Sequence, residues 1–96
     1  MLISNMRPRI SKFGIISRNA LFEHFSKNYV WMLTATIKDN VIIYHGEMMF
    51  RENKRPPEKI HITVSRASKN VISAESEHHG KFLNVDELLK YTKRSS

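Results

Sequence analysis

Two segments of alternating apolar and polar residues, separated by a pair of turn-forming residues, constrain the fold of this chain most strongly. Residues 29–38 and 41–50 each place apolar side chains at every second position, which is the period of a β-strand with one buried face. Asp39-Asn40 between them suits a two-residue hairpin turn. Because such a turn fixes the pairing register, we expect an antiparallel hairpin in which Lys38 pairs with Val41.

This register predicts which side chains share each face of the hairpin. On the buried face, the expected pairs are Ile37 with Ile42, Ala35 with Tyr44, Leu33 with Gly46 and Trp31 with Met48. On the solvated face, they are Thr34 with His45, Thr36 with Ile43 and Met32 with Glu47. Since two independent alternations agree under one register, we expect Trp31 to lie in the hydrophobic core and the polar face to carry few aromatic side chains.

Two further strands follow the hairpin. Residues 59–65 place Ile60, Ile62 and Val64 at alternate positions, and pairing Phe50 with Ile60 would keep these three side chains on the buried face. The connection from Arg51 to Lys59 is then a loop stiffened by two prolines. Residues 70–76 form a weaker fourth strand.

A helix is expected on each side of the strands. Ser17 is a good N-cap for a first helix, and Asn28 can adopt the left-handed conformation that ends it. Asn84 begins a second helix, and Glu87 lies three residues on, as in a capping box. The sequence therefore predicts an α+β fold, an antiparallel three- to four-stranded β-meander with an N-terminal and a C-terminal helix packed on one face.

The length and composition limit the class of protein. A chain of 96 residues suits one small domain, which we expect over residues 15–96 after a basic N-terminal arm at 1–14. There is no cysteine, which excludes disulfides and cysteine-based zinc sites and agrees with a cytoplasmic location. No apolar run approaches the roughly 18 residues of a membrane span, so none is expected.

Positive charge is the main functional signal. The chain has 16 basic and 9 acidic residues, a net charge of +7, and no acidic residue occurs in the first 22 positions. Such an excess attracts nucleic acid or another acidic partner. We expect the binding residues in the arm, its following helix and the proline-containing loop: Arg7, Arg9, Lys12, Arg18, Arg51, Lys54, Arg55 and Lys59. The alternatives are charge that serves solubility alone, and a mitochondrial targeting peptide at the N-terminus.

Histidines provide the only other candidate chemistry. His61-Ile62-Thr63 is a His-x-Thr pattern on a strand, which resembles one half of the paired pattern of the 2H phosphoesterases, where two histidines act as acid and base. This chain carries the pattern once. His78-His79 matches no metal-ligand spacing, so we expect a polar turn, dispensable histidines and no metal or cofactor.

Three functions are consistent with these features. The first is a small basic binding protein that docks on nucleic acid or on a nucleic-acid-handling protein. The second is an inhibitor or adaptor of the phage or accessory-genome type, which contacts only protein. The third is an enzyme, since the chain resembles RelE-like ribonuclease toxins in size, charge and order of elements. That resemblance implies His45 or His61 as the base and Arg51, Arg55 or Arg66 as the phosphate-stabilising groups. We expect a binding protein and no catalytic residues.

Overall fold

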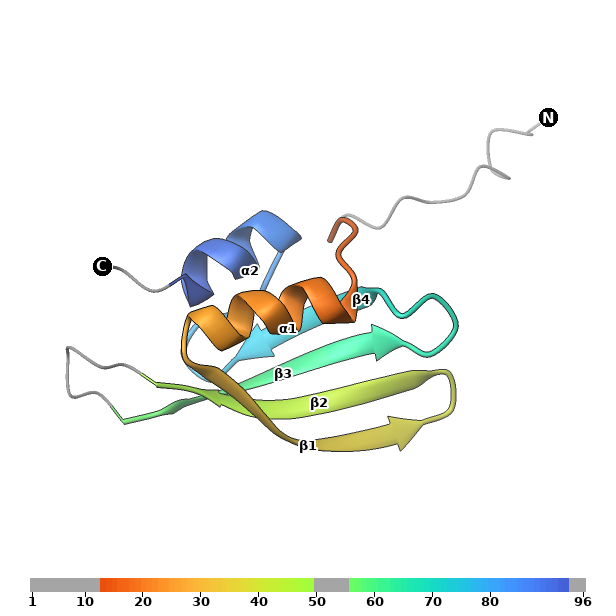
Figure 1. The fold of residues 1–96 in the computed structure, drawn as a ribbon, viewed down its shortest axis with the longest axis horizontal. Coiled ribbons are helices and arrows are strands. Elements are labelled where there is room, and N and C mark those ends of the chain that lie inside the picture. The colour runs from red at the N-terminus through yellow and green to blue at the C-terminus, as the bar shows by residue number, and fades with distance from the viewer. Residues whose placement is uncertain (1–12, 50–55, 94–96) are drawn as a thin grey trace.

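Two helices cover one face of an antiparallel sheet, and no element of the described chain covers the other face (Figure 1). The computed structural model describes residues 13–49 and 56–93. Its elements are α1 (Arg18–Lys27), β1 (Val30–Lys38), β2 (Val41–Met48), β3 (Glu58–Ser65), β4 (Val71–Ser76), β5 (Gly80–Lys81) and α2 (Val85–Thr92). The predicted α+β meander with two helices on one face is therefore confirmed. The short strand β5 was not predicted.

The strands lie in the order β1-β2-β3-β4-β5, so each one pairs with its neighbour in sequence. Short turns make this possible at every connection except the longer one between β2 and β3. Asp39 adopts a left-handed φ of 49° between β1 and β2, and Lys69 adopts a φ of 63° before β4. Residues 77–79 form the turn between β4 and β5, where a polar turn was expected. The meander leaves β1 and β5 as the two edges of the sheet.

Capping side chains set the ends of both helices. The Ser17 hydroxyl accepts a hydrogen bond from the Ala20 N–H at 3.1 Å, and the Asn84 side chain accepts one from the Glu87 N–H at 2.8 Å, as predicted. The left-handed residue after α1 is Tyr29, with a φ of 59°, and not Asn28. The Asn28 side chain instead donates to the His24 carbonyl at 2.7 Å, so Asn28 caps the helix while the chain reverses one residue later.

The hydrophobic core lies between the helices and the inner face of the sheet. Its most completely buried side chains come from α1, β3 and α2: Leu21, Phe25, Ile60, Ile62, Val64 and Leu88. This confirms the inward positions predicted for β3. Phe13, near the end of the segment expected to be an arm, is also buried, with 5% of its surface exposed. None of the helices within residues 13–49 and 56–93 is long and apolar enough to cross a bilayer.

The predicted hairpin register is confirmed near the turn and wrong beyond Thr34. Lys38 pairs with Val41, Ala35 with Tyr44 and Thr34 with His45. A β-bulge between Met32 and Thr34 then shifts the pairing, so that Met32 lies opposite Gly46 and Trp31 opposite Glu47. A bulge adds one residue to one strand. The side chains before it therefore lie on the opposite face of the sheet from the one that regular alternation predicts.

The bulge moves Trp31 out of the core. Trp31 is 48% exposed on the same face as His45, and Leu33 is 62% exposed, so the prediction that both are buried is wrong. Ile37 was also expected in the core but is 65% exposed. It keeps the predicted face, yet it adjoins a hairpin turn that extends beyond α1 (Figure 1), so no helix covers it.

Gly46 explains why the bulge forms here. A Cβ atom at this position would overlap the Trp31 carbonyl oxygen and the Met32 side chain. Glycine therefore allows the bulged strand to approach β2 closely, which is a common role of glycine within a strand.

The pairing predicted between Phe50 and Ile60 is also wrong. Ile60 pairs with Gly46, and Met48 pairs with Glu58, while Phe50 lies outside the described residues. The connection between β2 and β3 therefore begins at Met49 and ends at Pro57.

We predict that Gly46→Ala destabilises the protein by about 1–3 kcal/mol, because the added methyl group overlaps main-chain atoms that cannot move freely. Urea denaturation measures the change. Thr34→Ala, at an exposed position of the same hairpin, should change the free energy of unfolding by no more than about 0.5 kcal/mol. Equal effects of the two substitutions would contradict a close approach at Gly46.

Candidate functional site

The uncovered face of the sheet carries a continuous row of polar side chains. Adjacent pairings place Thr34, His45, His61, Glu75 and Lys81 side by side across all five strands. A neighbouring row contains Thr36, Ile43, Thr63 and Ser73. We call the face that holds these two rows the open face.

Two histidines lie at the centre of the open face. The rings of His45 and His61 have centroids 4.7 Å apart and meet edge to face, at 79°. The Thr36 hydroxyl lies 3.4 Å from the His45 Nε2 atom. His61 is exposed and His45 is half-buried, so the pair presents ring surface and polar nitrogen atoms to a ligand on this side.

The indole ring of Trp31 also lies on the open face, with Tyr29 beside it, which corrects the expectation that Trp31 lies on the core face. Trp31 lies opposite Glu47 in the sheet, and Glu47 lies opposite Lys59. The Tyr29 ring lies 5.9 Å from the Trp31 ring. Sequence reasoning missed this arrangement, although an isolated glycine within an alternating strand, here Gly46, is a recognised signal for a bulge.

These residue types suit planar ligands. A half-exposed indole ring and two imidazole rings offer flat surfaces on which nucleobases can stack. Threonine hydroxyls and the Lys59 ammonium group can donate hydrogen bonds to phosphate or sugar oxygens. The arrangement also places two potential proton carriers, His45 and His61, next to each other.

Most of the excess positive charge lies outside the described part of the chain. Residues 13–49 and 56–93 contain nine basic and eight acidic residues, a net charge of +1. The remaining segments, 1–12, 50–55 and 94–96, contain seven basic residues and one acidic residue, a net charge of +6. The described domain is therefore nearly neutral, and the segments that adjoin it hold almost all of the excess charge.

Only two of the predicted binding residues lie in the described part of the chain, and they lie on opposite sides of the sheet. Lys59 is exposed on the open face. Arg18 begins α1 on the covered side, where its guanidinium group donates to the Tyr44 hydroxyl at 3.0 Å and lies 5.8 Å from the centre of the Phe22 ring. Arg7, Arg9, Lys12, Arg51, Lys54 and Arg55 lie outside the described residues.

The attachment points of the two basic segments differ in their relation to the open face. Segment 50–55 leaves the sheet after Met49, whose N–H donates to the Tyr29 carbonyl at 2.9 Å, next to Trp31. Segment 1–12 joins the domain at Phe13, whose carbonyl accepts a hydrogen bond from the Val85 N–H at 2.7 Å. The first attachment point borders the open face, and the second lies at the start of α2.

A second polar cluster surrounds the buried carboxylate of Glu58. This side chain is completely buried and accepts hydrogen bonds from the Tyr91 hydroxyl at 2.9 Å and the His78 N–H at 2.9 Å. Burial raises the pKa of Glu58, but hydrogen bonds from the Ser76 side chain, the His78 N–H and Tyr91 outweigh it, so the pKa lies below its ordinary value of 4.5. The cluster joins β3, the β4–β5 turn and α2, which is a structural role.

His79 adjoins this cluster and is also held by neighbours. Its ring stacks on Phe82, with centroids 4.1 Å apart, and its Nε2 atom lies 3.1 Å from the Glu87 carboxylate. In the part of the chain that the structure describes, no three His, Cys, Asp or Glu side chains form a group that could hold a metal ion. These contacts make His79 part of the packing between β5 and α2.

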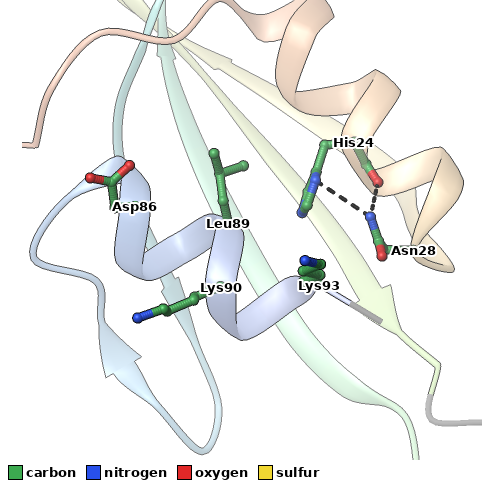
Figure 2. Close-up of a pocket in the computed structure, with 6 residues that line it drawn as sticks. All are labelled: His24, Asn28, Asp86, Leu89, Lys90 and Lys93. Carbon is green, nitrogen blue, oxygen red and sulfur yellow. Dashed lines mark hydrogen bonds between the residues drawn. The ribbon is translucent and has the colours of Figure 1, made fainter. Parts of the chain in front are cut away.

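An open hollow of about 590 Å³ lies between the two helices (Figure 2). Its lining residues are His24, Asn28, Asp86, Leu89, Lys90 and Lys93. Burial lowers the pKa of His24, and Lys27 and Lys93 lower it further, against a hydrogen bond from the imidazole to the Leu89 carbonyl that raises it. The His24 Nε2 atom already contacts the Thr92 hydroxyl at 2.9 Å. Two of the polar side chains that line the hollow, His24 and Asn28, are thus already held by each other and by their neighbours.

Comparison with known proteins does not assign a family. No family model, no curated protein and no solved structure matches this chain. The class that can be stated is a small α+β domain with a five-stranded meander and one open sheet face.

We predict that Tyr91→Phe destabilises the protein by about 1–3 kcal/mol at pH 7, because the buried Glu58 carboxylate loses a hydrogen-bond donor. Since the pKa of Glu58 is lowered by folding, its contribution to stability is present above pH 4.5 and is lost as the pH falls through the lower folded value. The difference between wild type and Tyr91→Phe should therefore shrink in acid. Urea denaturation from pH 7 to pH 3 measures this, with Glu75→Gln, an exposed carboxylate, as the control. A constant difference would contradict a charged Glu58.

Proposed function

We propose that this protein binds single-stranded nucleic acid on the open face of its sheet. The observation that carries the proposal is the position of Trp31, which the bulge places on the same face as the adjacent histidines His45 and His61. Proteins that bind single strands combine stacking surfaces with a positively charged path for the backbone.

The open face supplies the stacking surfaces. Successive bases can stack on Trp31 and on the imidazole rings of His45 and His61, and this kind of contact tolerates any base because each has a flat π-surface. Thr34, Thr36 and Thr63 share the face and offer hydroxyl groups to sugar and phosphate oxygens. A double helix would shield its base surfaces from such contacts, so the chemistry favours a single strand.

The basic segments supply the charge that the face itself lacks. Lys59 and Lys81 on the open face are offset by Glu47 and Glu75, so stacking without further cations would be weak against phosphate repulsion. Arg51, Lys54 and Arg55 belong to the connection that leaves the sheet beside Tyr29 and Trp31. We therefore favour this connection over the N-terminal segment as the source of phosphate contacts.

The histidine pair supports a second candidate function, cleavage of RNA. Adjacent imidazoles can act as the general base and the general acid of phosphodiester cleavage, and His45 and His61 lie 4.7 Å apart by ring centroids. This candidate ranks second because neither arginine of the described domain lies beside the histidine pair. Arg18 is hydrogen-bonded on the opposite side of the sheet, and Arg66 donates to the Asp39 carbonyl at the β1–β2 turn, at 3.1 Å.

We predict that Trp31→Ala and His61→Ala each weaken binding to a 12-nucleotide single-stranded RNA by roughly 5- to 150-fold, the effect of about 1–3 kcal/mol per stacked base. His78→Ala removes an exposed histidine in the β4–β5 turn and should leave the affinity unchanged. Fluorescence anisotropy of labelled RNA measures all three variants. In wild type, the emission of Trp31, the only tryptophan of the chain, should also be quenched on binding.

Three outcomes of this experiment would change the proposed function. Binding that is unchanged in Trp31→Ala and His61→Ala would exclude the open face. Cleavage of the RNA that is abolished in His45→Ala or His61→Ala would favour the ribonuclease. Absence of any binding to RNA or DNA at low salt would favour a protein partner, the remaining function that the sequence suggested.

We further predict that reversing Arg51, Lys54 and Arg55 to glutamate weakens binding evenly across RNA sequences. It should also lower the slope of log affinity against log salt by about one unit for each phosphate group that the variant no longer neutralises. A salt titration of wild type and variant measures both effects. Reversal of Arg7, Arg9 and Lys12 provides the matched comparison. A larger decrease in affinity for this second variant would assign the phosphate contacts to the N-terminal segment.

A further inference from the structure

The edge strand β1 lacks the features that usually prevent edges from pairing. Exposed edges are commonly protected by charged residues, by proline or by a very short strand. The eight residues from Val30 to Ile37 contain no charged residue and no proline, and the strand is nine residues long. The opposite edge, β5, has two residues and includes Lys81. The sheet therefore has one short, charged edge and one long edge whose only charged residue is Lys38, at its end.

The bulge protects only the first half of β1. Residues 34–38 pair with β2 in a regular register, and every residue from Thr34 to Lys38 is exposed. Hydrogen-bonded and non-hydrogen-bonded pairs alternate in an antiparallel ladder, so every second residue of this stretch directs its backbone N–H and C=O groups away from β2. These groups form a short template for one more antiparallel strand.

An uncovered apolar patch adjoins this template on the helix side of the sheet. Ala35 and Ile37 lie opposite Tyr44 and Ile42 in the register. Ile37 is 65% exposed, Ala35 is exposed and Ile42 is half-buried. A strand added at this edge would cover the patch if its own side chains on that side were apolar.

We propose that β1 pairs with β1 of a second copy of this chain, antiparallel, with the two-fold axis at Thr36. In this register Ala35 lies opposite Ile37 of the second copy. The helix side then carries two apolar rows of four side chains across the interface, each containing Tyr44, Ala35, Ile37 and Ile42. On the open face, Thr36 lies opposite its own counterpart and Thr34 lies opposite Lys38.

A second copy is a suitable partner for this edge because the side chains that lie opposite each other are compatible in charge as well as in apolar pattern. No like-charged residues lie opposite each other in this register, since Lys38 is the only charged residue from Thr34 to Lys38 and it faces Thr34. The described domain carries a net charge of only +1, so two domains repel each other weakly. A two-fold axis also pairs both edges with each other and leaves neither open for further copies.

Analytical ultracentrifugation of the full chain over a range of concentrations tests the proposal. We expect a reversible dimer that persists or strengthens at high salt, because the pairing does not depend on ion pairs and screening reduces the repulsion between the charged segments. Ile37→Lys should shift the protein to monomer. Ile15→Lys, at a 76% exposed isoleucine next to β4, should leave the dimer intact. A monomer at all concentrations, or equal weakening of the dimer by both substitutions, would overturn the proposal.

Cysteine cross-linking tests the register itself, because the chain contains no cysteine of its own. In the proposed pairing, the two copies of residue 36 have Cα atoms about 4.5–5.5 Å apart, within the range of a disulfide. The two copies of residue 34 are about 14 Å apart along the strands. Thr36→Cys should therefore give a disulfide-linked dimer on mild oxidation, while Thr34→Cys stays monomeric on a denaturing gel. Cross-linking of Thr34→Cys alone would overturn this pairing. Absence of both cross-links would overturn it as well, in favour of an extended segment of another protein on the edge.

Discussion

The close approach of β1 to Gly46 is the constraint on which the character of this domain depends. Because glycine has no Cβ atom, the Trp31 carbonyl and the Met32 side chain can lie against β2 at this point, and β1 accommodates one extra residue there. On the N-terminal side of the bulge, each side chain of β1 therefore lies on the face opposite to the one that an uninterrupted alternation would give it. Met32 packs against the core, whereas Trp31 joins the histidines on the open face.

The covered side of the sheet carries the packing that stabilises the domain, and the open side carries the groups of the proposed binding site. On the covered side, apolar side chains of the helices and β3 form the core, and Glu58 and His79 form hydrogen bonds and ring contacts between the strands and α2. Arg18 is held on that side as well. The open face bears the polar rows and the exposed rings, which the core does not depend on. A ligand there can therefore be bound without disturbing the core.

The excess positive charge belongs mainly to other parts of the chain. The described domain is close to neutral, and the excess lies in segments 1–12, 50–55 and 94–96. A nearly neutral domain can pack and pair through apolar contacts, while basic segments can attract the proposed negatively charged partner over a longer range. The proposed contacts of the open face and of the β1 edge use different surfaces, so both can occur in the same molecule.

Local sequence determined the class of fold and every element except the short strand β5. Ser17 and Asn84 were recognisable as helix caps, and Asp39-Asn40 located the hairpin turn, because these signals act between residues close in the chain. Tertiary structure decided the rest. The pairing of β2 with β3 depends on a long connection, and the bulge depends on contact between Gly46 and a neighbouring strand. Alternation alone predicted that Trp31 lies in the core, because a periodic pattern assumes an uninterrupted register. Only packing between the strands determines where the extra residue of a bulge is accommodated.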